Sequence, residues 1–401
     1  MVRAMSDVKT QYEAYPYPER DPKDEAKRLI TGSPSIPLEI DHFIFGGQRD
    51  WSKPLRVLVA GGGTGDGLIQ LAQMMTQAGR PYEITYVDLS TASRKVAEAR
   101  TKARKLSNIT FHTGSLLDAP DLGTFDYIDC CGVLHHLPDP AEGFTALRAS
   151  LAPGGGLGFM VYAPYGRSGV YPLQEAFGAL FDGLKPKARL NKAKALLKAL
   201  PDGHPFKRNP NLGDHKESDA GFYDLLLHSQ DLAFDVPALI EVMDQSGWAL
   251  SGFTMPALYD LARITEVPDG MAPLHQMELA EKLRGTIKTH VGYAVAKDSG
   301  QVPASGKTRT LVPHLKGVQP RALAQAVAQG QTPKLSFAGV EARLELPKDT
   351  ASLLAAIDGR RNLSEIAQGT RMDPIRMGTL WGAVERSLGD WGVLLYSSIM
   401  R

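Results

Sequence analysis

The chain contains little cysteine, no long apolar run and almost no net charge. Its only two cysteines among 401 residues, Cys130 and Cys131, are adjacent and lie within an apolar run. Such a pair forms neither a disulfide framework nor a metal-binding set, so we interpret both as residues of a buried strand in a reducing environment. No stretch approaches the length that crosses a bilayer, and nothing before Tyr12 resembles a secretory signal. These absences predict a cytoplasmic protein without a membrane span and without a bound metal.

The formal net charge is +1, so no global field attracts nucleic acid or a membrane surface. One stretch, residues 185–208, is locally basic, with Asp202 as its only acid. We interpret it as the solvated face of an amphipathic helix, and an acidic protein surface or RNA remains open as its partner. Nucleic acid is disfavoured, because Phe206 is the only aromatic side chain there that would stack on bases.

From Leu55 onward, apolar runs that end in glycine or polar residues alternate with segments of helical periodicity. "LRVLVA", "YEITYVDLS", "ITFHTGS", "FDYIDCCGVL", "GGGLGFMVY", "WALSGF" and "KTHVGYAVAK" have the character of seven strands. Strands that alternate with helices at this spacing indicate right-handed crossovers. The sequence therefore predicts an α/β, Rossmann-like fold with a seven-stranded, mostly parallel sheet.

The pattern also predicts domain boundaries. Residues 1–50 form an N-terminal segment, and residues 51–298 form the α/β domain with a helical insertion at about 165–235. Residues 308–401, after the linker Asp298–Lys307, form a small C-terminal α+β unit. Its "IDGRRNLSEIA" resembles small winged-helix domains used for peptide capture or dimerisation, which leaves a homodimer open.

A loop rich in glycine joins the first predicted strand to the first helix. "VLVAGGGTGDG" places Gly61, Gly63 and Gly65 at this turn, where positive φ and close approach of a ligand to the backbone are allowed. The next strand ends in Asp88, at a distance where a carboxylate accepts the hydroxyls of a ribose. The pattern predicts a nucleoside cofactor, but spaced glycines alone leave its identity open.

The order and spacing of five motifs narrow this choice. "VLVAGGGTG", "ITYVDLS", "ITFHTGSLLD", "FDYIDCCGVLHHLPDP" and "LAPGGGLGFMVY" resemble the motifs of class I S-adenosylmethionine-dependent methyltransferases over residues 50–165. The resemblance implies S-adenosylmethionine as cofactor and assigns it these contacts: Gly61, Gly63 and Gly65 to the methionine part, Asp88 to the ribose, Leu89, Ser115 and Leu116 to adenine, and Gly132 beneath the sulfonium.

Two positions depart from that family. Many relatives carry an acid where this chain has Val59, and many carry aspartate where it has Ser115. A closer resemblance, which includes "QYEAYPYPER" and "DLLLHSQDLAFDVPALIEVMDQSGW", points to a bacterial methyltransferase group often associated with tetratricopeptide repeats. That resemblance implies a protein as the suspected substrate.

Three side chains are candidates for catalysis. His136, in "GVLHHLP", has a side chain whose pKa lies near working pH, although the His pair also suits a purely structural loop. His228 and Asp231, in "LLLHSQDLAF", form a polar island between apolar runs and are placed either to deprotonate a substrate or to stabilise their own loop. The motif "NPPY" of many nitrogen-specific methyltransferases is absent after the fourth strand.

The segment "YEAYPYP" (residues 12–18) is unusually aromatic and stiff. Its prolines argue against an ordinary helix or a central strand. We predict that it folds across the cofactor pocket, with Tyr12 and Tyr17 in contact with the cofactor, because tyrosine faces attract a sulfonium. The alternative is a hydrophobic clamp that only ties this segment to the sheet.

Three functions therefore remain. The first is a methyltransferase that modifies a protein side chain. The second is a small-molecule methyltransferase in which the insertion acts as a lid. The third is an inactive cofactor-binding or assembly protein, which the substitutions at Val59 and Ser115 would fit.

Overall fold

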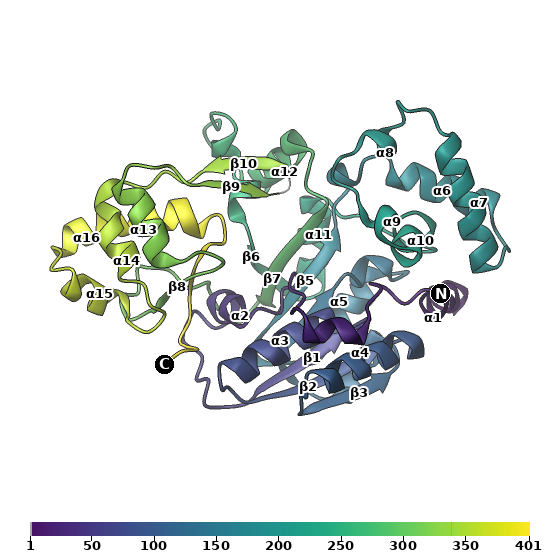
Figure 1. Ribbon diagram of the computed structural model, residues 1–401, viewed down its shortest axis with the longest axis horizontal. Helices are drawn as coiled ribbons and strands as arrows, with labels where there is room; N and C mark the ends of the chain where they lie inside the picture. Colours follow the sequence, from purple (N-terminus) through teal and green to yellow (C-terminus); the bar gives the residue numbers. More distant parts are fainter. Residues whose placement is uncertain (1, 338) are drawn as a thin grey trace.

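The structure is a computed structural model that describes residues 2–337 and 339–401, with side chains from residue 8 onward. At its centre lies a seven-stranded sheet of strand order β3-β2-β1-β4-β5-β7-β6 (Figure 1). The first five strands are parallel, and β7 is antiparallel to both of its neighbours. The predicted mostly parallel sheet is confirmed. The strands are β1 (Leu55–Ala60), β2 (Tyr82–Asp88), β3 (Ile109–Thr113), β4 (Phe125–Cys131), β5 (Leu151–Tyr162), β6 (Trp248–Phe253) and β7 (Thr289–Ala296).

Both faces of this sheet are covered, which explains why its central strands are almost continuously apolar. In β1, Val57 and Val59 point into one hydrophobic core, while Leu58 and Ala60 point into another. Helices α2 and α3 contribute to the first core, and α5 and α11 to the second. The helices that pack on the sheet are α2 (Pro37–Ile44), α3 (Asp66–Gln77), α4 (Thr91–Ala103), α5 (Pro140–Ala149), α11 (Val236–Gln245) and α12 (Pro273–Arg284), with the short turns η2 (Leu116–Leu122), η3 (Leu134–His136), η4 (Tyr165–Arg167), η5 (Pro256–Tyr259) and η6 (Leu261–Arg263) between them.

The predicted helical insertion lies between β5 and α11 and has a hydrophobic core of its own. Figure 1 shows it in teal at the end of the sheet domain opposite to the C-terminal unit. The basic stretch forms an amphipathic helix, as predicted, because Leu190 and Ala193 are buried while Lys187, Lys192 and Lys198 are exposed. The insertion helices are α6 (Val170–Leu180), α7 (Pro186–Ala199), α8 (Pro205–Arg208), α9 (Asp214–Glu217) and α10 (Asp219–Leu227).

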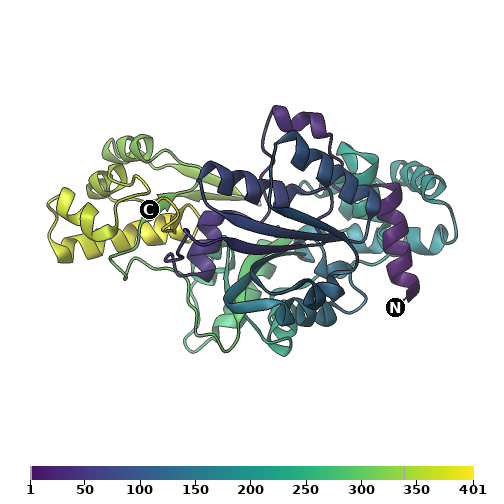
Figure 2. The same ribbon diagram turned by 90° about the horizontal axis from the view of Figure 1, so that it is seen from below.

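The N-terminal segment begins with helix α1 (Val2–Ala14), which lies beside the insertion in both views (Figures 1 and 2). The expectation of a non-helical residue 12–18 segment is therefore wrong for Tyr12–Ala14. These three residues precede the first proline, Pro16, so they keep their helical hydrogen bonds and only the part after Ala14 is extended. The turn η1 (Pro22–Ala26) follows.

The C-terminal unit packs on α2 and on the turn after β6, where the Ala257 amide donates to the Asp390 carbonyl (2.8 Å). Asp41 of α2 accepts hydrogen bonds from the Ser397 hydroxyl (2.7 Å) and from the Ser398 amide (2.9 Å). The predicted strand pair is present as an antiparallel hairpin of β9 and β10, and β8 pairs with β11. Its likeness to a winged helix stays a prediction. The elements are β8 (Pro313–Leu315), α13 (Pro320–Ala328), β9 (Lys334–Phe337), β10 (Val340–Arg343), η7 (Lys348–Thr350), α14 (Ala351–Ala355), α15 (Leu363–Gly369), α16 (Pro374–Val384), η8 (Glu385–Gly389) and β11 (Leu394–Tyr396).

The predicted linker is held against the sheet domain rather than hanging free. The Gln301 side-chain amide donates to the carbonyls of Ile44 (2.9 Å) and Gly154 (2.8 Å), and the Ala304 amide donates to the His42 carbonyl (2.8 Å). Within the described residues, no helix is long and apolar enough to span a bilayer.

Candidate functional site

A cavity of about 460 Å³ lies at the carboxyl ends of β1, β2 and β4. Ala60, Asp88 and Cys131, the last residues of these three strands, all line it. Residues of the N-terminal segment and of the insertion also line this cavity. This position, outside the carboxyl ends of parallel strands, is where open α/β sheets bind their ligands, and the volume suits a small-molecule cofactor.

The glycine loop forms one wall of this cavity. Gly61 and Gly63 have φ of +68° and +51°. A Cβ on Gly61 would lie 2.5 Å from the Val133 side chain, and one on Gly63 would lie 2.9 Å from the Tyr17 carbonyl oxygen. Glycine is therefore required at both positions, because the loop is in contact with the β4 exit on one side and with the N-terminal segment on the other.

Asp88 is held in a fixed orientation beside this loop. Its Oδ2 accepts the Gly63 amide hydrogen (2.8 Å), and its Oδ1 accepts the Ser90 amide hydrogen (2.8 Å). Burial raises the pKa of the Asp88 carboxyl, and these two hydrogen bonds oppose that effect. Each carboxylate oxygen keeps a further lone pair, so the group remains able to accept two hydroxyl donors from the cavity.

Of the other predicted cofactor contacts, one lies outside the cavity and the rest line it. Gly65 does not line the cavity: it precedes α3 with φ of +98°, and a Cβ there would lie 3.0 Å from Ala97, which indicates a packing role. Ser115 begins η2 in a capping box with Asp118, whose side chain accepts the Ser115 amide hydrogen (3.1 Å). The predicted residues that line the cavity are Tyr12, Tyr17, Gly61, Gly63, Asp88, Leu89, Ser115, Leu116, Gly132 and His136.

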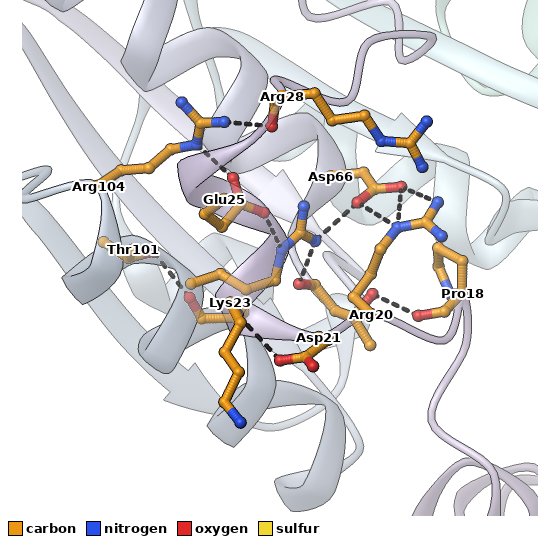
Figure 3. A network of polar contacts seen from close by, with 12 residues as sticks. Pro18, Arg20, Asp21, Lys23, Glu25, Arg28, Asp66, Thr101 and Arg104 are labelled. Carbon is orange, nitrogen blue, oxygen red and sulfur yellow. Dashed lines mark hydrogen bonds and ion pairs between the residues drawn. The ribbon is translucent and has the colours of Figure 1, made fainter.

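A network of charged side chains fastens the N-terminal segment to α3 and α4 next to the cavity (Figure 3). Arg20 donates to both carboxylate oxygens of Asp66, at 3.0 and 2.7 Å. Arg100, 1% exposed, contacts Asp66 (2.7 Å) and Glu25 (2.6 Å), and Arg104 also binds Glu25. Three guanidinium groups thus face two carboxylates, which leaves one positive charge in excess. Arg20 and Asp66 both line the cavity, so this excess is available to an anionic ligand group.

The acid that the sequence lacks at Val59 lies on the neighbouring strand instead. Asp129 of β4 pairs in register with Val59, lines the cavity and is 2% exposed. Its Oδ2 accepts a hydrogen bond from the Ser33 hydroxyl (3.1 Å). Burial raises the pKa of Asp129 to about 6, so it carries a negative charge at neutral pH. A carboxylate therefore faces this end of the cavity, although not from the expected strand.

In a second region of the cavity, which we call the His136 end, the predicted catalytic residues meet side chains that the sequence did not single out. The Tyr12 hydroxyl lies 2.9 Å from Oδ1 of Asp224 and 3.1 Å from Nε2 of His228. The Tyr162 hydroxyl donates to Oδ2 of Asp224 (3.1 Å). His136 stacks on His228, with ring centroids 3.7 Å apart. Helix α1, the insertion and the exits of β4 and β5 therefore converge here.

Asp231 does not line the cavity. Its Oδ2 accepts hydrogen bonds from Arg167 (3.1 Å) and from the Gln174 side chain (2.9 Å), and both charged side chains are almost fully buried. The Arg167 guanidinium in turn lies 3.5 Å from the centre of the Tyr162 ring. This geometry favours the interpretation that Asp231 stabilises its own loop, because its carboxylate is bound by Arg167 and Gln174 and does not face the cavity.

Sequence reasoning missed the residues that distant segments bring to the cavity. Arg20 was present in the quoted "YEAYPYPER", and Asp224 in the segment "DLLLHSQDLAF", but neither has a motif spacing relative to the strands. Asp129 carried a usable signal, since an acid between apolar residues in the middle of a strand, as in "YIDCCGVL", is rarely buried without a role. The missed residues that line the cavity are Arg20, Ser33, Asp66, Asp129, Met160, Tyr162, Arg167 and Asp224.

Comparison with known proteins finds a family match within the strand–helix core. Residues 58–157 match the family described as "Methyltransferase domain". An uncharacterized protein of Synechococcus sp. is 32% identical over 262 residues, which cover 63% of this chain and 61% of the relative's length. The ubiquinone biosynthesis O-methyltransferase of Albidiferax ferrireducens is 32% identical over 95 residues, 23% of this chain and 36% of that enzyme.

Among solved structures, PKMT2 from Rickettsia typhi in complex with AdoHcy is similar with a TM-score of 0.63 and 15% identity. The superposition covers 92% of this chain and 77% of that one. Because only 8% of the chain lies outside it, the shared fold extends into both the insertion and the C-terminal unit. The suggested association with tetratricopeptide repeats stays a prediction.

Proposed function

We propose that this chain, whose central domain has the class I methyltransferase fold, is an S-adenosylmethionine-dependent methyltransferase that modifies a protein side chain. One observation carries the cofactor assignment: the Gly61–Gly63 loop, Asp88 and Leu89 line one continuous cavity at the ends of β1 and β2. When bound, S-adenosylmethionine supplies a methyl group on a positively charged sulfur.

The residues of the cavity fit each part of this cofactor. Asp88 has free lone pairs for the ribose hydroxyls, and Leu89, Ser115 and Leu116 surround the adenine end. The excess positive charge of the network that includes Arg20 suits the cofactor's carboxylate, and the buried Asp129 carboxylate suits its amino group. Gly132, at φ of +80°, lets the β4 exit pass close to the sulfur.

A protein acceptor is supported by the exposed surface of the insertion. The same insertion that lines the cavity through Leu212, Asp214 and Asp224 also carries α7, which presents exposed lysines at positions 187, 192 and 198. A basic surface on the insertion complements an acidic target protein. Cytoplasmic location and a homodimer stay predictions.

A small-molecule acceptor is the second candidate, favoured by one contact. The Tyr12–Asp224 hydrogen bond joins the N-terminal helix to the insertion over the cavity, as a lid does. The third interpretation, an inactive cofactor-binding protein, is weakened by Asp129, which places an acid where the Val59 substitution had removed one.

Calorimetry with S-adenosylmethionine tests the cofactor assignment. We expect micromolar binding, with Asp88→Ala weakening it at least tenfold because two charge-assisted hydrogen bonds are lost. Glu83→Ala, on the same strand with an exposed side chain, is the matched control and should bind normally. No binding, or equal binding by Asp88→Ala, would refute the assignment.

Transfer of labelled methyl from S-adenosylmethionine into a cell lysate, fractionated by size, then tests the acceptor. Label in the protein fraction supports the proposal. Label confined to small molecules would favour the lid interpretation, and no label at all, despite cofactor binding, would favour the inactive protein.

A further inference from the structure

His136 and His228 stack on each other, and each imidazole forms a hydrogen bond with the backbone of one residue, Gln230. Nδ1 of His136 lies 2.8 Å from the carbonyl oxygen of Gln230, and Nδ1 of His228 lies 3.1 Å from the amide nitrogen of Gln230. A carbonyl oxygen only accepts a hydrogen bond, and an amide N–H only donates one. Gln230 therefore imposes different tautomers on two imidazoles whose rings lie 3.7 Å apart.

The tautomers decide which imidazole is a base. His136 must carry its hydrogen on Nδ1, so in the neutral ring Nε2 holds a free lone pair. His228 must accept at Nδ1, so its hydrogen is on Nε2, which lies 3.1 Å from the Tyr12 hydroxyl. The Tyr12 hydroxyl thus receives a hydrogen bond from His228 and donates its own hydrogen to Asp224 at 2.9 Å.

Only one of the two imidazoles reaches the cavity. His136 lines it together with Tyr12, Tyr162 and Asp224, whereas His228 lies behind His136. His136 follows Gly132 and Val133 in the β4 exit, which places it on the side of the cavity assigned to the sulfur. A base at this position faces an acceptor group that approaches the methyl carbon.

Asp224 is the counter-charge in this cluster. It is 3% exposed, and the hydrogen bonds described for it come from two tyrosine hydroxyls rather than from a cation. A ring nitrogen of His136, a ring nitrogen of His228 and a carboxylate oxygen of Asp224 all lie within 4.8 Å of one another. A positive charge that arises on His136 is therefore neutralised by a carboxylate that the fold already holds in place.

We infer that His136 is the general base of methyl transfer, and that Asp224, oriented by Tyr12 and Tyr162, stabilises the imidazolium that forms. The inference rests on the proposed function. The lone pair of the acceptor atom forms the bond to the methyl carbon, while the carbon–sulfur bond breaks and its electron pair stays on sulfur. The acceptor's proton moves to Nε2 of His136: a hydroxyl loses it as the oxygen attacks, whereas an ammonium group loses it beforehand, which frees the lone pair of the nitrogen.

His228 and Tyr12 are positioning residues in this assembly, since they act on Asp224 and on the ring stack rather than on the acceptor. Several titratable or charged groups lie around His136. They come from the N-terminal helix, from its own turn, from β5 and η4, and from α10 and the loop after it: Tyr12, His135, Tyr162, Arg167, Asp224, His228 and Asp231.

Nitrogen-15 spectra of histidine-labelled protein test the tautomers without any substrate. Long-range ¹H–¹⁵N correlations distinguish Nδ1–H from Nε2–H rings, and the spectra of His136→Gln and His228→Gln assign the two signals. We expect the Nδ1–H form for His136 and the Nε2–H form for His228 near pH 8. The reverse pair, or the same tautomer for both, would overturn the inference even if the protein is a methyltransferase.

Methyl transfer into lysate supplies the second readout. His136→Gln should bind S-adenosylmethionine within threefold of the unaltered protein but transfer methyl at least a hundredfold more slowly, and it should lose the fall in rate at acidic pH. His275→Gln, on the exposed face of α12, is the control and should behave as the unaltered protein.

The two proposals fail in different ways. Absence of cofactor binding or of any transfer by the unaltered protein would refute the proposed function, and the tautomers remain measurable. Normal transfer by His136→Gln would refute the inference alone. Loss of transfer on chelation, restored by added Zn²⁺, would also overturn it, because a metal ion would then occupy the Nε2 lone pair.

Discussion

The two ends of the cavity differ in how their charges are compensated. At the Arg20 end, carboxylates and guanidinium groups bind one another directly in the network of Arg20, Asp66, Arg100, Glu25 and Arg104. At the His136 end, the described contacts of the Asp224 carboxylate are phenolic hydroxyls, and the buried His135 ring has no hydrogen-bond partner among the described residues.

This difference suits two different tasks. A network of charges that bind one another directly is rigid and costs little to keep in place when a ligand arrives. The imidazoles of His135 and His228 are kept neutral by burial, which lowers their pKa well below the usual range. The first end is built to hold a ligand, and the second is built to exchange a proton.

The largest effect is expected from removal of residues 1–18, which dismantles the His136 end while leaving the Arg20 network complete. Tyr12 and Tyr17 leave the cavity wall, so we expect methyl transfer to fall more than a hundredfold, with circular dichroism close to that of the full chain. Tyr15→Ala tests whether the segment acts in the cavity or only as a clamp. Tyr15 stacks on Tyr223 of the insertion, with ring centroids 5.1 Å apart, and does not line the cavity. If Tyr15→Ala reproduces the whole effect, the segment is only a clamp.

The Arg20 end is broken by Arg20→Gln. Loss of the excess positive charge should raise the dissociation constant of S-adenosylmethionine about tenfold to a hundredfold, because a charge-assisted hydrogen bond to the cofactor's carboxylate is lost. Arg28→Gln removes the same charge from the neighbouring, exposed side chain and should leave affinity within threefold. Equal losses in the two variants, measured by calorimetry, would mean that only the general field matters.

Asp129→Asn is expected to raise the stability of the protein and to lower its affinity for S-adenosylmethionine. The pKa of Asp129 is about 6 when folded and about 3.9 when unfolded, so the unfolded chain ionises first as pH rises and the folded state loses stability up to pH 6. Asparagine cannot ionise, so the variant should gain about 2–3 kcal/mol at pH 8 and about half of that at pH 5, while binding S-adenosylmethionine more weakly. Urea unfolding at both pH values measures this gain, and a gain independent of pH would contradict the assignment.

The smallest effect is expected from Tyr12→Phe, which removes one hydroxyl and keeps the ring. Asp224 loses one of its two tyrosine donors, and His228 loses its partner, so we expect transfer to slow about threefold to tenfold with cofactor affinity unchanged. Tyr15→Phe is the matched control outside the cavity. A change in the dissociation constant without a change in rate would place Tyr12 with the cofactor, as its sequence had suggested, and not with the proton acceptor.

The glycine loop and Asp88, which line the cavity at the ends of β1 and β2, could be predicted from the sequence. The apolar runs, the spaced glycines and Asp88 follow one another along the chain, and the sheet places the ends of neighbouring parallel strands at one edge. Gly65 was assigned to the cofactor because spacing alone does not separate a glycine that lines a pocket from one that lets Ala97 of α4 approach. His228 and Asp231 were chosen as a local pair, yet the structure turns one toward Tyr12 and the other toward Arg167.

The sequence by itself determined the seven-stranded sheet, its parallel core and the loop that carries Gly61 and Gly63, because these depend on local periodicity and on contacts between neighbouring strands. Only the tertiary structure decided that Arg20 meets Asp66, that Asp129 supplies the acid absent at Val59, and that Tyr12 meets Asp224 across 212 residues of chain. Such contacts join segments whose separation follows no period, so their chemistry depends on how the insertion and the N-terminal helix close over the sheet.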